Sequence, residues 1–124
     1  MTPLGAKLRR MRADRGIALK DMAKALNVSS AYLSALEHGK RGKPTWFLVQ
    51  RIIAYFNVIW DEAEEIQRLA EISDPKISID TSAQAPEATE LTNILAREIG
   101  RLSPEDCKAL RDEIIRRAVR AKTA

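Results

Sequence analysis

The chain of 124 residues has the length of one ordinary domain, or of a small domain with an appendage. It is 45% hydrophobic, 31% charged and 5% aromatic, which is typical of a helix-rich soluble protein rather than of a β-sandwich or barrel. The longest apolar run, residues 52–56, is far shorter than the roughly 20 residues that span a bilayer. The chain also starts without the apolar stretch of a secretory signal. We therefore expect a cytoplasmic protein with no membrane partner.

Residues that could carry out catalysis or bind a metal are scarce. A single cysteine, Cys107, excludes an internal disulfide. With one histidine besides it, the chain lacks the residues of the usual Cys/His zinc site, and no spacing indicates a catalytic nucleophile. We expect no metal, no cofactor and no enzymatic activity.

Charge is distributed unevenly along the chain. Residues 1–58 hold 11 basic and 3 acidic side chains, residues 59–90 hold 2 and 9, and residues 91–124 hold 8 and 5, for a net charge of +4. A basic N-terminal segment favours a polyanion as partner. The alternative is that the acidic middle only balances the basic start.

Helical periodicity predicts five short helices in the N-terminal half of the chain. The first covers residues 3–15 and ends at Gly16. Asn27, which tolerates the left-handed conformation, makes the turn before a third helix that is capped by Ser29 and ended by Gly39. The residues expected to share the apolar face of each helix are Leu4, Leu8 and Met11; Met22, Ala23 and Leu26; Leu33 and Leu36; Leu48, Ile52, Ile53 and Phe56; and Ile66, Leu69 and Ala70.

The fourth and fifth helices follow a loop that is identified by its composition, residues 40–44. Thr45 is a suitable N-cap for the fourth helix. The fifth is expected to start at Asp61, with Glu64 as the partner in a capping box. We assign the aromatic residues of this region to the core, because helical spacing relative to the apolar face of the fourth helix explains them: Trp46, Phe47, Tyr55 and Trp60.

The remaining chain is expected to contain a linker and a helical hairpin. In the linker, residues 73–87, Ile77 and Ile79 alternate with polar neighbours, which is compatible with a short strand over residues 76–81. Residues 88–124 contain two helices, neither of which can bury its apolar stripe alone, so we expect this region to mediate dimerisation. The residues expected in that interface are Leu91, Ile94, Leu95, Ile99, Leu110, Ile114 and Ala118.

A set of N-terminal residues has a distinctive combined spacing: Gly16, Met22, Ala23, Asn27, Val28, Ser29, Leu33, Leu36, Glu37, Gly39 and Lys40. This pattern, within residues 3–58, resembles the helix-turn-helix of the XRE family, the lambdoid phage repressor and Cro type of DNA-binding domain. The resemblance implies an all-α, five-helix domain over residues 1–72, whose third helix lies in the DNA major groove while the second crosses the backbone. Ala18 and Leu19 stand where the family usually has a Ser or Thr cap and a phosphate-binding glutamine.

The third predicted helix presents small side chains opposite its inward residues, Leu33 and Leu36. Such a face can approach base edges closely, since serine can donate or accept and alanine can contact a thymine methyl group. The alternative is a helix that is merely exposed to solvent. We expect base contacts from Ser29, Ser30, Ala31, Tyr32, Ser34 and Ala35. We expect phosphate contacts from Lys20, Lys24, His38, Lys40, Arg41 and Lys43.

Arg12 and Glu37 each follow an inward apolar residue, Leu8 and Leu33, by four positions. Each should therefore lie at the inner edge of its helix. The family resemblance implies an ion pair between them that ties the first helix to the third. Two separately solvated charges are the alternative.

Two functions remain open on these observations. The first is a dimeric, sequence-specific repressor that binds double-stranded DNA at an inverted repeat. The resemblance implies that such a protein represses its own promoter and phage-like or mobile-element genes. The second is an antitoxin of the XRE type, whose acidic middle and C-terminal hairpin cover a toxin protein.

Overall fold

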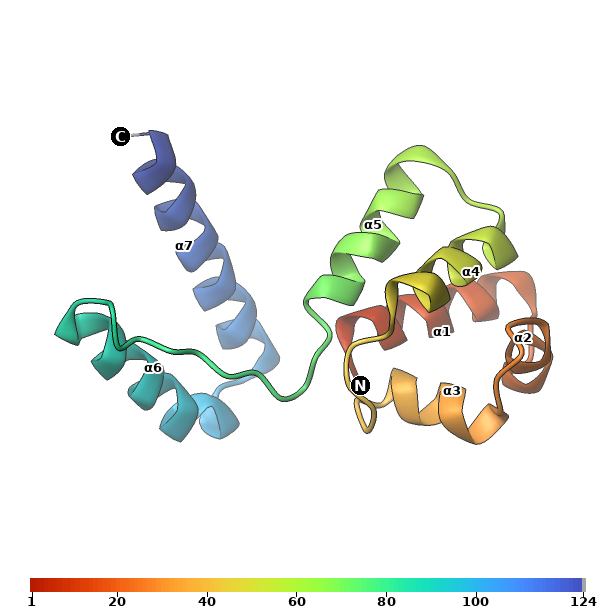
Figure 1. Ribbon diagram of the computed structural model, residues 1–124, viewed down its shortest axis with the longest axis horizontal. Coiled ribbons are helices and arrows are strands. Elements are labelled where there is room, and N and C mark those ends of the chain that lie inside the picture. Colours follow the sequence, from red (N-terminus) through yellow and green to blue (C-terminus); the bar gives the residue numbers. More distant parts are fainter. Residues whose placement is uncertain (124) are drawn as a thin grey trace. The chain divides into compact units, whose positions relative to one another are not determined.

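The computed structural model describes residues 1–123 and contains, over that range, seven α-helices and one 3-10 turn (Figure 1). The all-α prediction is therefore confirmed. The chain divides into two units, Met1–Ile77 and Ser78–Ala124. The first unit contains α1 (Pro3–Arg15), α2 (Leu19–Ala25), α3 (Ser30–Glu37), α4 (Trp46–Phe56) and α5 (Trp60–Glu71). The second contains α6 (Pro86–Glu98), the 3-10 turn η1 (Ile99–Arg101) and α7 (Pro104–Thr123).

Local side-chain and backbone preferences set most helix ends of the first unit. The hydroxyls of Thr2, Ser29 and Thr45 each accept a hydrogen bond from the backbone N–H three residues later, at 2.9–3.2 Å. These are N-caps, which satisfy amides that have no partner inside the helix. Gly16 ends α1 with φ of 65°, and Asn27 makes the turn after α2 with φ of 59°. Glycine and asparagine adopt this left-handed conformation most readily.

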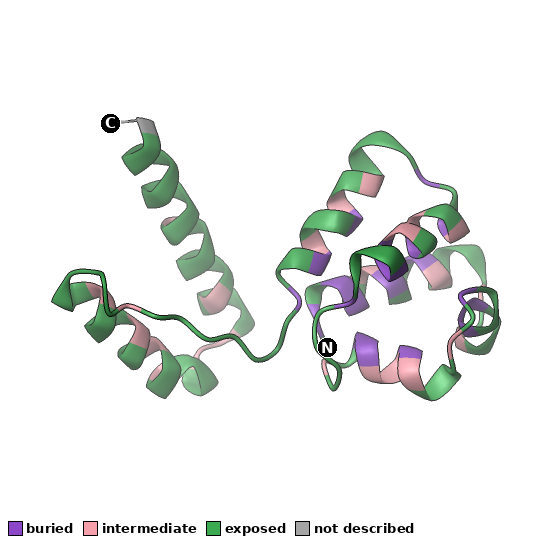
Figure 2. Cartoon of the chain, in the orientation of Figure 1, coloured by how far each residue is buried: buried purple, intermediate pink, exposed green. Residues whose placement is uncertain are grey.

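One apolar face from each of α1 to α5 builds the core of the first unit (Figure 2). The inward positions recur at helical spacing, so each helix buries a stripe and leaves its other side in water. The buried hydrophobic residues are Leu4, Leu8, Met11, Met22, Ala23, Leu26, Leu33, Leu36, Leu48, Val49, Ile52, Phe56, Val58, Ile66 and Ala70.

The start of α1 lies directly on the end of α3. The backbone N–H of Thr2 donates to the carbonyl oxygen of Glu37 at 3.0 Å. A Cβ atom on Gly5 would lie 2.1 Å from that same oxygen, so only glycine permits this approach. The segment just after α5 also contacts the start of α1. There, the buried Ser73 hydroxyl accepts a hydrogen bond from the backbone N–H of Leu4 at 3.0 Å.

The segment that follows α5 does not form the expected strand. In the part of the chain that the structure describes, residues 76–81 have no strand assignment, so this expectation was wrong. Asp74 and Asp80 each accept a hydrogen bond from the backbone N–H two residues later, at 3.0 and 2.9 Å. Such aspartate turns bend the chain locally and compete with extended pairing. Ile77 and Ile79 are consequently exposed.

Three of the four aromatic residues assigned to the core are on the surface. Trp46, Phe47 and Trp60 are 66%, 73% and 80% exposed, so their assignment was wrong. Trp46 and Phe47 precede the buried Ile52 by six and five positions, which places them off its face in a helix of 3.6 residues per turn. Tyr55 follows Ile52 by three positions and does pack against the core.

The fifth helix begins one residue earlier than expected. α5 starts at Trp60, with Ile59 in the N-cap position and no side-chain cap hydrogen bond. The expected capping box of Asp61 and Glu64 is therefore wrong. Trp60 itself has φ of 54°, and this sharp turn of the backbone opens the helix before Asp61 is reached. Asp61 lies in the first turn instead, where its charge complements the helix dipole.

The second unit consists of helices without an enclosed core. From Ser78 to Lys122, the burial of each side chain is described and none is buried (Figure 2). α7 begins with a reciprocal cap, in which the Ser103 hydroxyl accepts from the N–H of Asp106 at 3.0 Å and the Asp106 carboxylate accepts from the N–H of Ser103 at 3.4 Å. Over residues 1–123, no helix combines the length and hydropathy needed to cross a membrane.

The contact between Gly5 and Glu37 predicts the effect of a single methyl group. Glycine to alanine inside a helix ordinarily stabilises it by about 1 kcal/mol. Here the added methyl group meets backbone at 2.1 Å, and α1 must move away from α3. We expect Gly5→Ala to lower the free energy of unfolding by about 2 kcal/mol or more, measured by urea denaturation. Gly42→Ala is the control, since no atom lies within 4 Å of that position. Equal stability of the two variants would contradict the close approach.

Candidate nucleic-acid interface

The third helix presents small side chains to solvent. Leu33 and Leu36 are buried, which turns the opposite face of α3 outward. Ser29, Ser30 and Ala31 are exposed at the start of the helix. The other residues expected to contact bases, Tyr32, Ser34 and Ala35, are half-buried. The first turn of α3 is thus its most accessible part, and its side chains are short enough to let the backbone approach another molecule.

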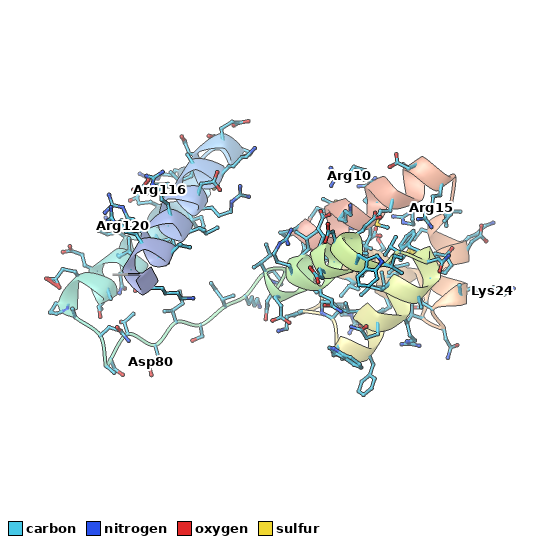
Figure 3. All side chains as sticks on the ribbon, turned by 90° about the horizontal axis from the view of Figure 1, so that it is seen from above. Arg10, Arg15, Lys24, Asp80, Arg116 and Arg120 are labelled. Atoms are coloured by element: carbon cyan, nitrogen blue, oxygen red, sulfur yellow. The ribbon has the colours of Figure 1, made fainter. Side chains whose placement is uncertain are left out.

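Basic side chains lie at both ends of this face. Lys20 and Lys24 are exposed on α2, and Figure 3 shows Lys24 extending from the surface of the first unit. Lys40 and Arg41 are exposed in the loop after α3. The Arg41 guanidinium lies 5.3 Å from the centre of the Tyr32 ring. This is within cation–π range, and the interaction holds the arginine beside α3.

Two of the expected phosphate-binding residues already have protein partners. The Nδ1 atom of His38 lies 2.8 Å from the carbonyl oxygen of Ser34. The Nζ atom of Lys43 lies 3.0 Å from a carboxylate oxygen of Glu71, and both side chains are exposed. An exposed pair of this kind contributes little stability, so a phosphate can compete with Glu71 for Lys43.

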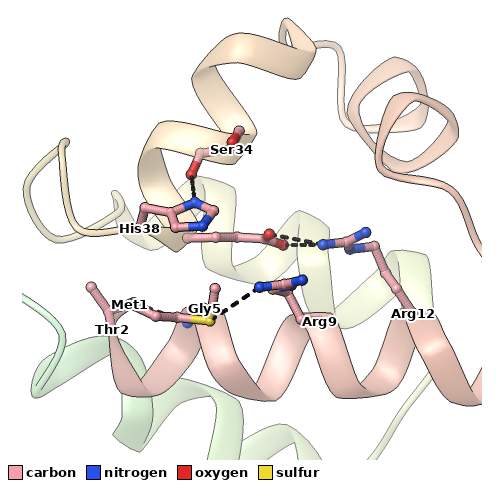
Figure 4. A network of polar contacts seen from close by, with 8 residues as sticks. Met1, Thr2, Gly5, Arg9, Arg12, Ser34 and His38 are labelled. Carbon is pink, nitrogen blue, oxygen red and sulfur yellow. Dashed lines mark hydrogen bonds and ion pairs between the residues drawn. The ribbon is translucent and has the colours of Figure 1, made fainter.

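Arg12 and Glu37 form an ion pair that joins α1 to α3 (Figure 4). One guanidinium nitrogen of Arg12, Nη2, donates to both carboxylate oxygens of Glu37, at 2.8 and 3.0 Å. The two side chains are only 13% and 2% exposed. Water screens such a pair weakly, so each charge depends on the other for its solvation. The pair fixes α3 with its small-residue face directed outward.

Burial raises the pKa of Glu37 above its ordinary value of 4.5. Removing the carboxylate from water disfavours its charged form, and this outweighs the opposing attraction of Arg12. Arg9 and His38 also favour the charged form but contribute less. The folded domain therefore holds the Glu37 proton more tightly than the unfolded chain does.

Two arginines outside the expected set support the geometry of the interface. Arg51 on α4 donates to the carbonyl oxygen of Leu26 at 3.0 Å, at the end of α2. Arg15 donates to the carbonyl oxygen of Phe56 at 2.5 Å and lies over its ring. Sequence reasoning missed both, because their partners are 25 and 41 residues away along the chain. The sequence offered a general signal for these contacts, because arginine side chains often donate hydrogen bonds to the carbonyl oxygens at helix C-termini.

The comparison with protein families agrees with the helical arrangement of the first unit. Residues 3–69, more than half of the chain, match a family described as helix-turn-helix domain. The chain belongs to this family, which confirms the predicted resemblance to XRE-type helix-turn-helix proteins. The first unit therefore contains a helix-turn-helix DNA-binding domain.

One relative illustrates the extent of the similarity. The chain is 33% identical over 61 residues to the uncharacterized HTH-type transcriptional regulator RghRB of Bacillus subtilis (strain 168). The aligned region is 49% of this chain and 44% of that protein. The shared part is thus less than half of either. No solved structure matches the chain significantly.

Removing one partner of the Arg12–Glu37 pair leaves a nearly buried charge without compensation. We expect Glu37→Ala to lower the free energy of unfolding by about 3–5 kcal/mol and the melting temperature by about 10 °C or more. Thermal melts followed by circular dichroism measure the change. Glu64→Ala, at an exposed position of α5, is the matched control and should melt like the wild type. A melting curve of Glu37→Ala that overlays the wild type would show that the Arg12–Glu37 pair does not stabilise the domain.

The raised pKa of Glu37 predicts an unusual dependence of stability on pH. Because the folded state binds this proton more tightly, the stability that comes from protonation of Glu37 is full below pH 4.5 and is lost as the pH rises through the raised pKa. Glu37→Gln cannot titrate and provides the reference. We expect the free energy of unfolding of the wild type, relative to Glu37→Gln, to fall between acidic and neutral pH. A difference that grows with pH would mean that Arg12 dominates and that the pKa is lowered.

Proposed function

We propose that this protein is a transcriptional regulator of the repressor kind, which binds double-stranded DNA as a dimer at a specific inverted-repeat operator. The observation that carries the proposal is the exposed small-residue face at the start of α3, placed between the basic side chains of α2 and the following loop. This combination fits a helix inserted in the major groove with phosphates on either side.

Base recognition in this proposal depends on close approach. Ser30 and Ala31, exposed in the first turn of α3, reach base edges first. A serine hydroxyl can donate to or accept from a base, and alanine packs against a thymine methyl group, but neither makes a bidentate contact. Ser34 and Ala35 are reached only where the helix enters deeply. Direct readout is therefore modest at each position, and the shape of the operator supplies additional discrimination.

Phosphate contacts supply most of the affinity and fix the orientation of the domain. Lys20, Lys24, Lys40 and Arg41 are exposed and are the main candidates. Arg41 contributes from a position already restrained by the Tyr32 ring, which reduces the side-chain entropy lost on binding. His38 and Lys43 join when DNA replaces their present partners. Each contact made by a basic side chain releases a counterion from the DNA.

The second unit supplies the dimer contact in this proposal. A single helix-turn-helix covers one half-site, so a dimer is needed to read an inverted repeat. We assign residues 73–87 as linker and residues 88–124 as dimerisation region. The apolar side chains available for that contact are Leu91, Ile94, Leu95, Ile99, Leu110, Ile114 and Ala118, which are exposed or half-buried. The family resemblance suggests its targets: the protein would repress its own promoter and phage-like or mobile-element genes.

The same apolar side chains would also suit an antitoxin whose partner protein covers them. The charge pattern of α7, described below, favours a second copy of this chain as the occupant. A protein that copurifies in a fixed ratio and prevents self-association would favour the antitoxin function instead.

Footprinting of the region upstream of the protein's own gene tests the proposal. We expect two protected half-sites whose centres are about one helical turn, 10–10.5 base pairs, apart. Substituting both Ser30 and Ser34 with alanine removes two hydroxyl groups that read bases, so specific affinity should fall about tenfold or more. Ser82→Ala, outside the helix-turn-helix, is the control and should bind as the wild type does. Protection that persists unchanged in the Ser30/Ser34 variant would exclude these residues from base reading.

A phosphate contact is distinguished from a base contact in the same assay. Lys40→Ala should weaken binding to specific and unrelated DNA alike. It should also reduce the slope of log K against log salt by about 0.9. A slope that stays at the wild-type value would place Lys40 away from the DNA backbone.

A further inference from the structure

The last helix, α7, carries a stripe of apolar or small residues. The intervals between these residues read the same from either end of the stripe. Its members are Cys107, Leu110, Ile114, Ala118 and Ala121, separated by 3, 4, 4 and 3 residues. At 3.6 residues per turn, all five lie on one side of the helix. Cys107 is half-buried and the other four are exposed, with Leu110 at 47% and Ile114 at 55%.

A stripe of this kind is complementary to itself when two copies of the helix run in opposite directions. A twofold axis through Ile114 sets this residue against its own copy. The same axis sets Leu110 of one chain against Ala118 of the other, and Cys107 against Ala121. A leucine then meets an alanine on each side of a central isoleucine pair, and the two small side chains of cysteine and alanine meet beyond it, which allows close packing at the usual helix separation of about 8–10 Å.

The charges of α7 favour the same direction. Residues 104–113 carry four acidic and two basic side chains, whereas residues 114–122 carry four basic and no acidic ones. Figure 3 shows Arg116 and Arg120 on this second half. An antiparallel pair sets each acidic half against a basic half. A parallel pair would set the two basic halves together, and like charges at such distances repel.

We propose that α7 pairs antiparallel with α7 of a second copy of the chain, in the register centred on Ile114. This pairing is a specific form of the dimer in the proposed function, and it rests on that proposal for its biological role. Its twofold symmetry matches that of an inverted repeat. The exposed Ile115 lies beside the stripe, on one flank of the contact.

Cross-linking of cysteines in the full-length protein tests the register. Ala121→Cys, with Cys107 retained, places a cysteine of each chain opposite one of its partner, so a short bis-maleimide should convert most of the protein to a covalent dimer. In the wild type the two Cys107 residues are about 21 Å apart along the helix axis and should not be joined. Asp112→Cys, with Cys107 retained, is the control on the opposite face and should also stay monomeric under denaturing electrophoresis.

Two results would overturn the pairing. One is a cross-linked dimer of the wild type, which indicates a parallel arrangement. The other is the absence of dimer with Ala121→Cys, which includes the case of a different protein covering α7. Footprinting of the same Ala121→Cys preparation without cross-linker separates this failure from that of the proposed function. Twofold protection without cross-linking rejects only the register, whereas cross-linking without any protection rejects only the DNA-binding role.

Discussion

The ion pair between Arg12 and Glu37 is the contact on which the position of α3, and with it the proposed DNA-binding surface, depends. α3 is only eight residues long, too short to be a stable helix alone, so its conformation and direction come from tertiary contacts. Its apolar side supplies two buried leucines, and its last residue is a nearly buried carboxylate held by Arg12. The backbone contact of Glu37 with Thr2, permitted by Gly5, adds to this at the same point. Together these contacts leave the serine and alanine face free.

Much of the helical domain could be predicted from sequence because its signals are local. N-caps at Ser29 and Thr45, and left-handed residues at Gly16 and Asn27, depend on neighbours within a few positions. The apolar stripes repeat at helical spacing, so the buried leucines and isoleucines were identifiable. Three of the four aromatic residues assigned to the core were assigned wrongly, because hydrophobicity alone does not specify a face. Trp46, six positions before Ile52, lies off the buried face of its helix and is exposed.

Contacts between distant segments were harder to anticipate. Arg51 and Arg15 bind carbonyl oxygens of other helices, and no local pattern indicates which carbonyl an arginine will reach. The short strand failed for a related reason. Alternation suggested it, but strands need a partner, and aspartate turns at Asp74 and Asp80 shape that segment instead. The Lys43–Glu71 contact likewise joins a loop to a helix end far along the chain.

A double-mutant cycle at Arg12 and Glu37 shows whether this pair positions α3, with unfolding free energy and operator affinity measured on the same four proteins. If the two residues act as one unit that positions α3, removing both should destabilise the domain by less than the sum of the single effects, with a coupling of about 1 kcal/mol or more. Operator affinity should show coupling of the same sign. Additive effects in both measurements would mean that Arg12 and Glu37 act independently and that other contacts position α3.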